Sequence, residues 1–360
     1  MEERITMGVK EVVGLDLGDK YSRLCVVEAK SGEVIEGARI TTSPNAVKRR
    51  FGSCERQRVA IEVGTHSPWV SRLIEECGHE VIVANPRKVR LISANKRKSD
   101  KIDAEFLARL ARVDPKLLAP VRHRGKTAQA SLSVLRSREA LVRARRDLVG
   151  HARGICKAMG YRLPAWSPKT FAKKAPAVLP GPLKPAMRPV LAAIRSLTCQ
   201  IQKLDKQVEV LGTESFPETK ILRQVNGIGP VTSLAYLLVL EDPTRFRSSR
   251  SVGAYLGLVP ARDESGESKP ELRISKEGDR FLRSLLVNAA QYILGPFGED
   301  CDLRRYGMKI AASGGKLAKK RAVIAVARKL AVLLHALWRT RATYEPLYSA
   351  NRAQRAKPAA

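Results

Sequence analysis

The spacing of apolar residues changes once along the chain, and this change limits what the chain can fold into. Up to about residue 120, short strand-like runs alternate with stretches of helical spacing, which is typical of a three-layer α/β domain. Over residues 127–157, pairs of adjacent apolar residues instead recur every seven positions. Over residues 190–211, single apolar residues alternate four and three apart. These heptads predict two long helices in a coiled-coil arm, either folded back on itself or dimerising. Two ordinary helices of an all-α domain remain the alternative.

The α/β part contains several candidate strands separated by helices. Helical spacing covers residues 67–77 and returns from residue 100 onward, and a turn at residues 30–32 joins two of the strands. The strands are the apolar runs at residues 11–15, 22–28, 32–41, 59–62 and 80–84. We therefore expect an α/β domain over residues 1–125.

Beyond the first heptad segment, proline and glycine mark the boundaries. Prolines between residues 164 and 189 exclude a continuous helix and predict the tip of an arm over residues 126–217. A mainly α domain is expected at 218–348, followed by a basic tail at 349–360. Within the 218–348 domain, Gly227 and Gly229 interrupt two apolar helical patterns. This arrangement resembles a helix-hairpin-helix whose backbone N–H groups approach a phosphate. A plain tight turn between helices is the alternative.

The charge of the chain points to a polyanionic partner. Lys and Arg number 66 against 35 Asp and Glu, a formal net charge of +31, while 44% of the residues are hydrophobic, which excludes a disordered basic tail. Nucleic acid fits best because the positive charge is spread along the chain. The 6 cysteines and 5 histidines are too scattered for a zinc knuckle or a redox pair. The N-terminus lacks signal-peptide features and no apolar run reaches about 18 residues, so we expect a soluble, cytoplasmic, nucleoid-associated protein without membrane contact.

Four acidic residues stand where carboxylates can converge. Asp16 and Glu62 each end a predicted strand, and Asp100 and Asp103 lie three apart at the start of a predicted helix. Carboxylates held close together need a cation, and their hard oxygens favour Mg²⁺ or Mn²⁺ in a two-metal phosphoryl-transfer site. Taken singly, each has a structural alternative: Asp16 as a turn residue, Asp100 as a helix cap and Asp103 as a first-turn acid.

Basic residues precede the second acidic pair. The segment 86–98 carries no acid, and its cations could guide a phosphate backbone to the metal ions. We take them as candidate nucleic-acid contacts: Arg87, Lys88, Arg90, Lys96, Arg97 and Lys98.

Taken together, these motifs resemble the bacterial insertion-sequence transposases of the DEDD type, whose N-terminal domain is similar to the Holliday-junction resolvase RuvC. The resemblance spans nearly the whole chain. It is carried by Gly14-Leu15-Asp16, by residues 61–69 around Glu62, by Asn85-Pro86, by residues 98–104 with both later acids, and by residues 226–229, 254–260, 264–266 and 273–278. Many relatives have Ala-Thr where this chain has Val63-Gly64.

The resemblance implies a ribonuclease-H-like N-terminal domain, a coiled-coil arm and a helical transposase domain. It implies catalytic acids at Asp16, Glu62, Asp100 and Asp103, and a serine nucleophile that forms a covalent phosphoserine link to DNA; Ser265 is the matching position. It also implies a homo-oligomer of dimers paired into tetramers, double-stranded DNA from element ends and target, and a structured non-coding RNA encoded by the element. The matching residues Arg273 and Lys276 join Gly227 and Gly229 as candidate nucleic-acid contacts.

From the residues alone, the polar, turn-like segment around Ser265 favours an exposed hydroxyl on a loop, and Ser268 and Ser275 are alternative nucleophiles. The main expectation is a transposase that excises and inserts its own element. The principal alternative is a metal-dependent junction endonuclease that uses water as nucleophile. An actin-like ATPase, suggested by the glycines around Asp16, and a purely architectural nucleic-acid binder are two further readings.

Overall fold

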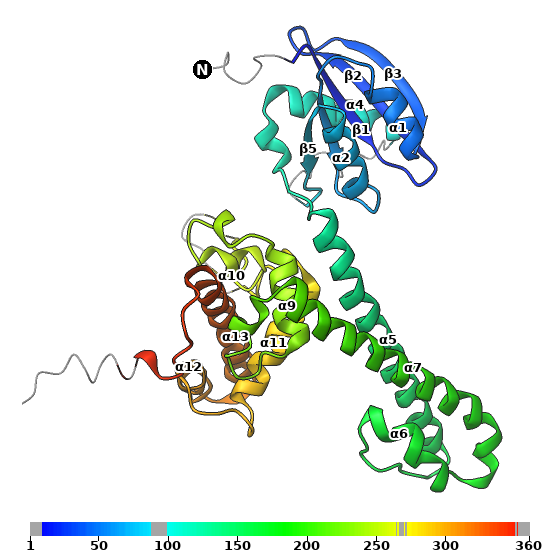
Figure 1. Cartoon of the computed structure of the whole chain (residues 1–360), viewed down its shortest axis with the longest axis vertical. Coiled ribbons are helices and arrows are strands. Elements are labelled where there is room, and N and C mark those ends of the chain that lie inside the picture. The colour runs from blue at the N-terminus through cyan, green and yellow to red at the C-terminus, as the bar shows by residue number, and fades with distance from the viewer. Residues whose placement is uncertain are drawn as a thin grey trace, which may run out of the picture. The chain divides into compact units, whose positions relative to one another are not determined.

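The computed structural model describes residues 9–87, 99–263, 265, 270, 272–349 and 351 of the 360-residue chain (Figure 1). The chain divides between Arg124 and Gly125 into two compact units. The N-terminal unit holds the α/β elements, and the second unit holds the arm and the C-terminal helices.

The N-terminal unit is built on a five-stranded mixed sheet with strand order β3-β2-β1-β4-β5. Strand β1 is parallel to β4, and β4 is parallel to β5, whereas β2 runs antiparallel to both of its neighbours. All five strands lie within two residues of their predicted limits: β1 (Glu11–Asp16), β2 (Tyr21–Glu28), β3 (Val34–Thr41), β4 (Arg58–Glu62) and β5 (Glu80–Ala84).

Helices cover both faces of this sheet, which confirms the three-layer α/β expectation (Figure 1). Helices α1 (Pro44–Phe51) and α2 (Ser67–Glu76) pack on one face, around the buried Phe51. Helix α4 (Asp100–Val113) packs on the other and is followed by a 3-10 turn, η1 (Pro115–Leu118). The pattern did not predict α1, although Ser43 caps it and Pro44 follows at its first position, a typical helix start.

The arm consists of two long antiparallel helices, α5 (Lys126–Ala158) and α7 (Lys184–Val210) (Figure 1). Arg138 donates to Asp205 at 2.5 Å, and Arg145, seven residues on, donates to Thr198, seven residues back (3.3 Å). This register confirms two long paired helices, while a true coiled coil stays a prediction. Helix α7 continues as one π-helical turn, η4 (Leu211–Ser215).

The proline-rich segment between α5 and α7 forms a small helical tip. It contains α6 (Pro168–Lys174) and the 3-10 turns η2 (Ala175–Ala177) and η3 (Gly181–Leu183). The fully buried Phe171 anchors it against residues of both long helices. The tip therefore has its own apolar core, which stabilises a segment that proline would otherwise leave irregular.

The C-terminal helices pack around α9 (Pro230–Leu240), which is apolar on all sides and buried. The Tyr236 hydroxyl of α9 donates to the carbonyl of Ala331 at 2.6 Å, which satisfies the buried phenol. The surrounding elements are α8 (Thr219–Leu222), η5 (Pro243–Arg245), α10 (Ser251–Tyr255), α11 (Arg280–Leu294), α12 (Asp302–Ala311) and α13 (Gly315–Thr340).

The base of the arm shares this C-terminal core. Ala128, Leu132 and Leu135 of α5 and Val208 of α7 belong to the same buried cluster as α9. The segments expected as an arm at 126–217 and a domain at 218–348 therefore fold around common apolar residues. In the part of the chain that the structure describes, no helix combines the length and apolar character needed to cross a membrane.

Candidate active site

Asp16 and Glu62 end neighbouring parallel strands. Leu15 of β1 lies opposite Ile61 of β4, so the two acids that follow are neighbours across the sheet. Their backbones lie on adjacent strands, which are about 4.8 Å apart. Residues two apart on a strand share a face, which places Asp16 on the face of Gly14, under α4. Glu62 lies on the same face through Ala60, which packs with α4. Both acids are half-buried and engaged in contacts with other residues.

Helix α4 presses directly on β1 because Gly14 has no side chain. A Cβ at this glycine would lie 1.9 Å from the carbonyl oxygen of Ala104 and 2.6 Å from the amide nitrogen of Ala108. The guanidinium of Arg58, at the start of β4, donates to the carbonyl of Ala111 at 3.4 Å. The C-terminal part of α4 thus lies at the start of β4, and its first turn lies toward the carboxyl ends of β1 and β4.

The first turn of α4 carries the other two acids. Ser99 is the N-cap, its hydroxyl accepting from the amide of Ile102 at 3.4 Å, so Asp100 is not the capping residue. Asp100 and Asp103 lie in the first turn, where the helix dipole favours negative charge. Asp100 is exposed and Asp103 half-buried. The fold thus carries all four acids toward one edge of the sheet.

The donor set suits a hard divalent ion, since all four side chains are carboxylates on one edge. Within residues 9–87, 99–263 and the other described positions, however, no three His, Cys, Asp or Glu side chains are close enough to hold one ion. The residues therefore fit Mg²⁺ or Mn²⁺ by type and by edge, and a shared ion requires their carboxylates to come closer than in this conformation.

A histidine that the charge analysis passed over lies at the same edge. His66 precedes α2, and its Nδ1 accepts from the indole N–H of Trp69 at 3.1 Å. A neutral imidazole then carries its proton on Nε2, which lies 3.5 Å from Oδ1 of Asp19. Asp19 follows β1, and His66 follows β4. The sequence signal for His66 was its spacing of three residues from Trp69, which brings the two rings together on one helical turn.

Of the basic residues predicted to guide a phosphate backbone, the structure describes only Arg87. Arg87 is exposed, and its amide donates to the side chain of Asn85 at 3.1 Å. Lys88, Arg90, Lys96, Arg97 and Lys98 lie outside the described residues.

In the second unit, the glycine motif forms a turn before α9. Gly227 has φ +88° and packs against Tyr292, and the exposed Gly229 is the N-cap of α9. The helix before the turn, α8, spans only Thr219–Leu222. The structure therefore has a short helix, a glycine turn and a helix, and a helix-hairpin-helix with phosphate contacts stays a prediction.

Ser265 is exposed in a segment whose two ends are tied together. Pro260 and Ile274 form an antiparallel bridge, Ala261 donates to the carbonyl of Arg273 at 2.9 Å, and Lys276 donates to Gly257 at 3.2 Å. The side chains of Arg273 and Lys276 are exposed beside this bridge. Of the rival serines, Ser275 accepts from the amide of Glu277 (3.4 Å), a turn-forming role, and Ser268 lies outside the described residues.

Comparisons with known proteins match both units. A family model for the DEDD transposase of IS110, described as a transposase, matches residues 13–159, which include the four acids. A second model, described as "Transposase IS116/IS110/IS902 family", matches residues 219–298, which include Ser265 and both glycines.

Two curated relatives match most of the chain, and a third matches less than half of it. A probable family 20 transposase of Pseudomonas aeruginosa is 29% identical over 80% of this chain and 86% of its own. The transposase for insertion sequence element IS1111A of Coxiella burnetii is 25% identical over 95% of this chain and 93% of its own. A pilin gene-inverting protein of Moraxella lacunata is 30% identical over 41% of this chain and 45% of its own. The RuvC structure of Thermus thermophilus aligns at 22% identity and TM-score 0.22, covering 29% of this chain and 96% of that chain.

The ordered motifs, the two family models and the full-length relatives agree. The N-terminal unit is a ribonuclease-H-like α/β domain of the DEDD type. With acids at the edge of this domain and the second family segment downstream, the chain belongs to the IS110 family of DEDD transposases, enzymes that cleave and rejoin DNA.

Proposed function

We propose that this transposase excises and inserts its own insertion sequence, with Asp16, Glu62, Asp100 and Asp103 as its metal-binding acids. The observation that carries the proposal is the approach of α4 to Gly14, which brings the first turn of α4 to the edge where β1 and β4 end. The proposal is supported because segments far apart in sequence direct their acids toward the same edge of the sheet. Bound Mg²⁺ or Mn²⁺ would supply Lewis-acid polarisation of the scissile phosphate there.

Ser265 is the proposed nucleophile. Its Oγ–phosphorus bond forms as a phosphorus–oxygen bond to one sugar breaks; the serine proton is lost to solvent, and the departing sugar oxygen takes up a proton. The sugar hydroxyl of another strand then attacks the phosphoserine and restores the serine. This route keeps the energy of the phosphodiester bond, so broken ends can be rejoined without a further energy source. The exposure of Ser265 on a segment tied at its base supports the assignment.

The relatives support rejoining rather than simple hydrolysis. One relative is named for inverting a pilin gene. Inversion of a segment requires every broken end to be joined again, which a covalent intermediate accomplishes directly.

We propose that the protein acts as a homo-oligomer, a dimer that pairs into a tetramer on DNA. The acids and the serine are then free to come from different subunits.

Nucleic-acid partners follow from the charge. A net charge of +31 with only 5% aromatic residues suits duplex DNA and a folded RNA backbone. We propose that double-stranded element ends and target DNA bind together with a structured RNA encoded by the element. The logarithm of affinity should fall steeply and linearly with the logarithm of salt concentration, and a flat dependence would contradict phosphate contacts. Sequencing of RNA that co-purifies with the protein tests the RNA: a transcript from the flanks of its own gene is expected.

The nucleophile is tested by substitution on element-end DNA. Wild-type protein should form a covalent protein–DNA adduct, Ser265→Ala should form none, and Ser275→Ala should keep it because the Ser275 hydroxyl accepts from the amide of Glu277 in its own turn. Asp16→Asn should abolish both adduct and cleavage. If Ser265→Ala still cleaves, water is the nucleophile and the junction-endonuclease alternative replaces this proposal.

A further inference from the structure

A strip of exposed side chains on β2 and β3 continues the row of the proposed catalytic acids. Strand pairing places Arg23 of β2 opposite Asp16, and Arg39 of β3 opposite Arg23. Directly opposed residues point to the same side of a sheet. The row across the sheet therefore reads Arg39, Arg23, Asp16, Glu62, all toward the face that carries α4.

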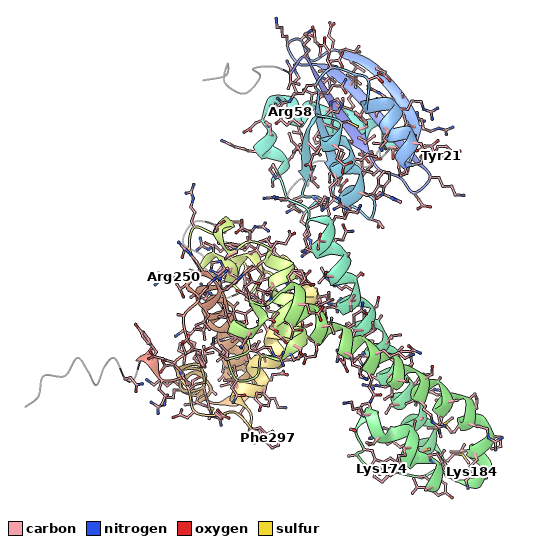
Figure 2. The ribbon with its side chains drawn as sticks, viewed as in Figure 1. Tyr21, Arg58, Lys174, Lys184, Arg250 and Phe297 are labelled. Atoms are coloured by element: carbon pink, nitrogen blue, oxygen red, sulfur yellow. The ribbon has the colours of Figure 1, made fainter. Side chains whose placement is uncertain are left out.

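Helix α4 does not extend over this end of β2 and β3, whose side chains are exposed among the residues that the structure describes. Cys25 and Val27, further along β2 on the same face, are buried under α4, whereas Arg23 and Arg39 are exposed. Tyr21, next to Arg23 on this face, is 52% exposed and lies at the periphery of the N-terminal unit (Figure 2). We call Tyr21, Arg23 and Arg39 the basic strip.

The composition of the strip is unfavourable for the protein alone. Two arginines directly opposite one another across antiparallel strands repel. The guanidinium of Arg39 lies over the Tyr21 ring at 4.5 Å from its centroid, so it is held in place by an aromatic face rather than by an acid. The nearby acid of β3, Glu36, points to the opposite face of the sheet and pairs there with Arg50 at 3.1 Å. Two exposed arginines on neighbouring strands, one of them stacked on an aromatic ring, suit an anionic ligand with a planar part.

We propose that the basic strip binds an unpaired DNA nucleotide beside the scissile phosphate, with Arg23 and Arg39 on the phosphates and Tyr21 against the base. This inference rests on the proposed role of Asp16. Neighbouring strands are about 4.8 Å apart, so Arg23 lies one strand and Arg39 about 10 Å from the acids, the length of about three stacked nucleotides. Aromatic stacking tolerates any base, and a base offers its face only when it is not enclosed within a duplex.

Photo-crosslinking of the full-length protein tests the contact locally. Element-end DNA should carry 5-iododeoxyuridine at each of the three nucleotides on either side of the cleavage point, either paired or opposite a mismatch. Mass spectrometry should then find the crosslink at Tyr21, more strongly with the mismatched base. Tyr161, which is equally exposed at 52%, is the reference for non-specific crosslinking. An RNA oligonucleotide with 5-iodouridine should crosslink less at Tyr21.

Substitutions then separate stacking and charge. Tyr21→Ala should weaken binding of mismatched element-end DNA about 5-fold or more, the lower end of what one stacked base contributes, while Tyr21→Phe should bind normally. Arg39→Gln should reduce Tyr21 crosslinking and lower the salt slope by about one. Arg49→Gln is the matched control, because Arg49 is exposed on α1, which packs on the opposite face.

Absence of a Tyr21 crosslink above the Tyr161 level, or a crosslink with RNA alone, would overturn the proposal. These failures are distinct from failure of the proposed function. If Asp16→Asn abolishes cleavage while Tyr21 gives no crosslink, the catalytic site stands and the strip does not bind DNA. If Asp16→Asn still cleaves, the catalytic assignment fails first.

Discussion

The contact between Gly14 and α4 sets the position of Asp100 and Asp103. A methyl group at Gly14 should therefore move these two acids away from Asp16 and Glu62. An alanine Cβ would lie 1.9 Å from the Ala104 carbonyl oxygen, whereas real contacts of this kind are not found under 3.0 Å. The three nearest atoms, from Ala104 and Ala108, all belong to the backbone of α4, so the helix must move away by about 1 Å. Overpacking of this kind costs about 1–3 kcal/mol of stability. A displacement of about 1 Å in a catalytic site can cost about 10²-fold in rate.

Gly14→Ala should therefore cleave element-end DNA about 10²-fold more slowly while the protein remains folded and still binds DNA. Strand cleavage is measured on end-labelled DNA, stability by urea unfolding, and the position of α4 by hydrogen exchange of its peptide. Gly37→Ala is the matched control in the same sheet, because nothing lies within 4 Å of its Cβ position. Wild-type cleavage by Gly14→Ala, with unchanged exchange in α4, would refute the reasoning.

Three further predictions concern other parts of the chain. His335 is buried, and burial lowers its pKa below the ordinary 6.5, so the folded state resists a proton that the unfolded state accepts; unfolding free energy should fall as pH drops below about 6.5, and His335→Gln should flatten this dependence in urea unfolding at pH 5 and 7. A Cβ at Gly307 would lie 2.6 Å from side-chain carbons of Leu294 and Val326, so Gly307→Ala should lower unfolding free energy by about 1–3 kcal/mol without changing the cleavage chemistry of the folded fraction. Removal of divalent ions with a chelator should stop strand cleavage and Mg²⁺ should restore it; cleavage that persists in chelator would exclude metal dependence.

The elements that sequence periodicity predicted are those whose signal is local. Each strand of the N-terminal sheet was visible because its apolar residues are consecutive or alternate, and α5 was visible because its apolar pairs recur every seven positions from residue 134 to residue 156. Helix α1 was missed because eight residues, several of them basic, give too short an apolar pattern. Ser43 and Pro44 are helix-start signals that the sequence contains, but without an apolar pattern after them they do not predict a helix.

The candidate site was predicted in its residue types and only partly in its arrangement. Acids at strand ends can be recognised in sequence, but which strands are neighbours depends on contacts between distant segments. The register that places Arg23 opposite Asp16 could not be read from sequence, nor could the contact of α4 with Gly14. The basic strip could not be predicted from the sequence, because Arg39 lies beside Tyr21 and Arg23 only through the pairing of β3 with β2.

Charge repulsion among the four acids acts at the edge of the sheet where β1 and β4 end. Four carboxylates directed toward one edge of the sheet repel each other, and two features of the fold offset this repulsion. The first turn of α4 presents its positive dipole end to Asp100 and Asp103, and Arg23 lies next to Asp16 on the adjoining strand. This arrangement keeps the acids on one edge but apart, in agreement with the absence of any three-residue acidic, His or Cys cluster among the described residues. The four carboxylates repel a DNA phosphate that approaches them directly, so a divalent ion is needed to join the acids to the phosphate. Because that ion would satisfy both, DNA phosphate and metal should each raise the other's affinity at this site, whereas the basic strip beside it attracts DNA whether or not metal is present.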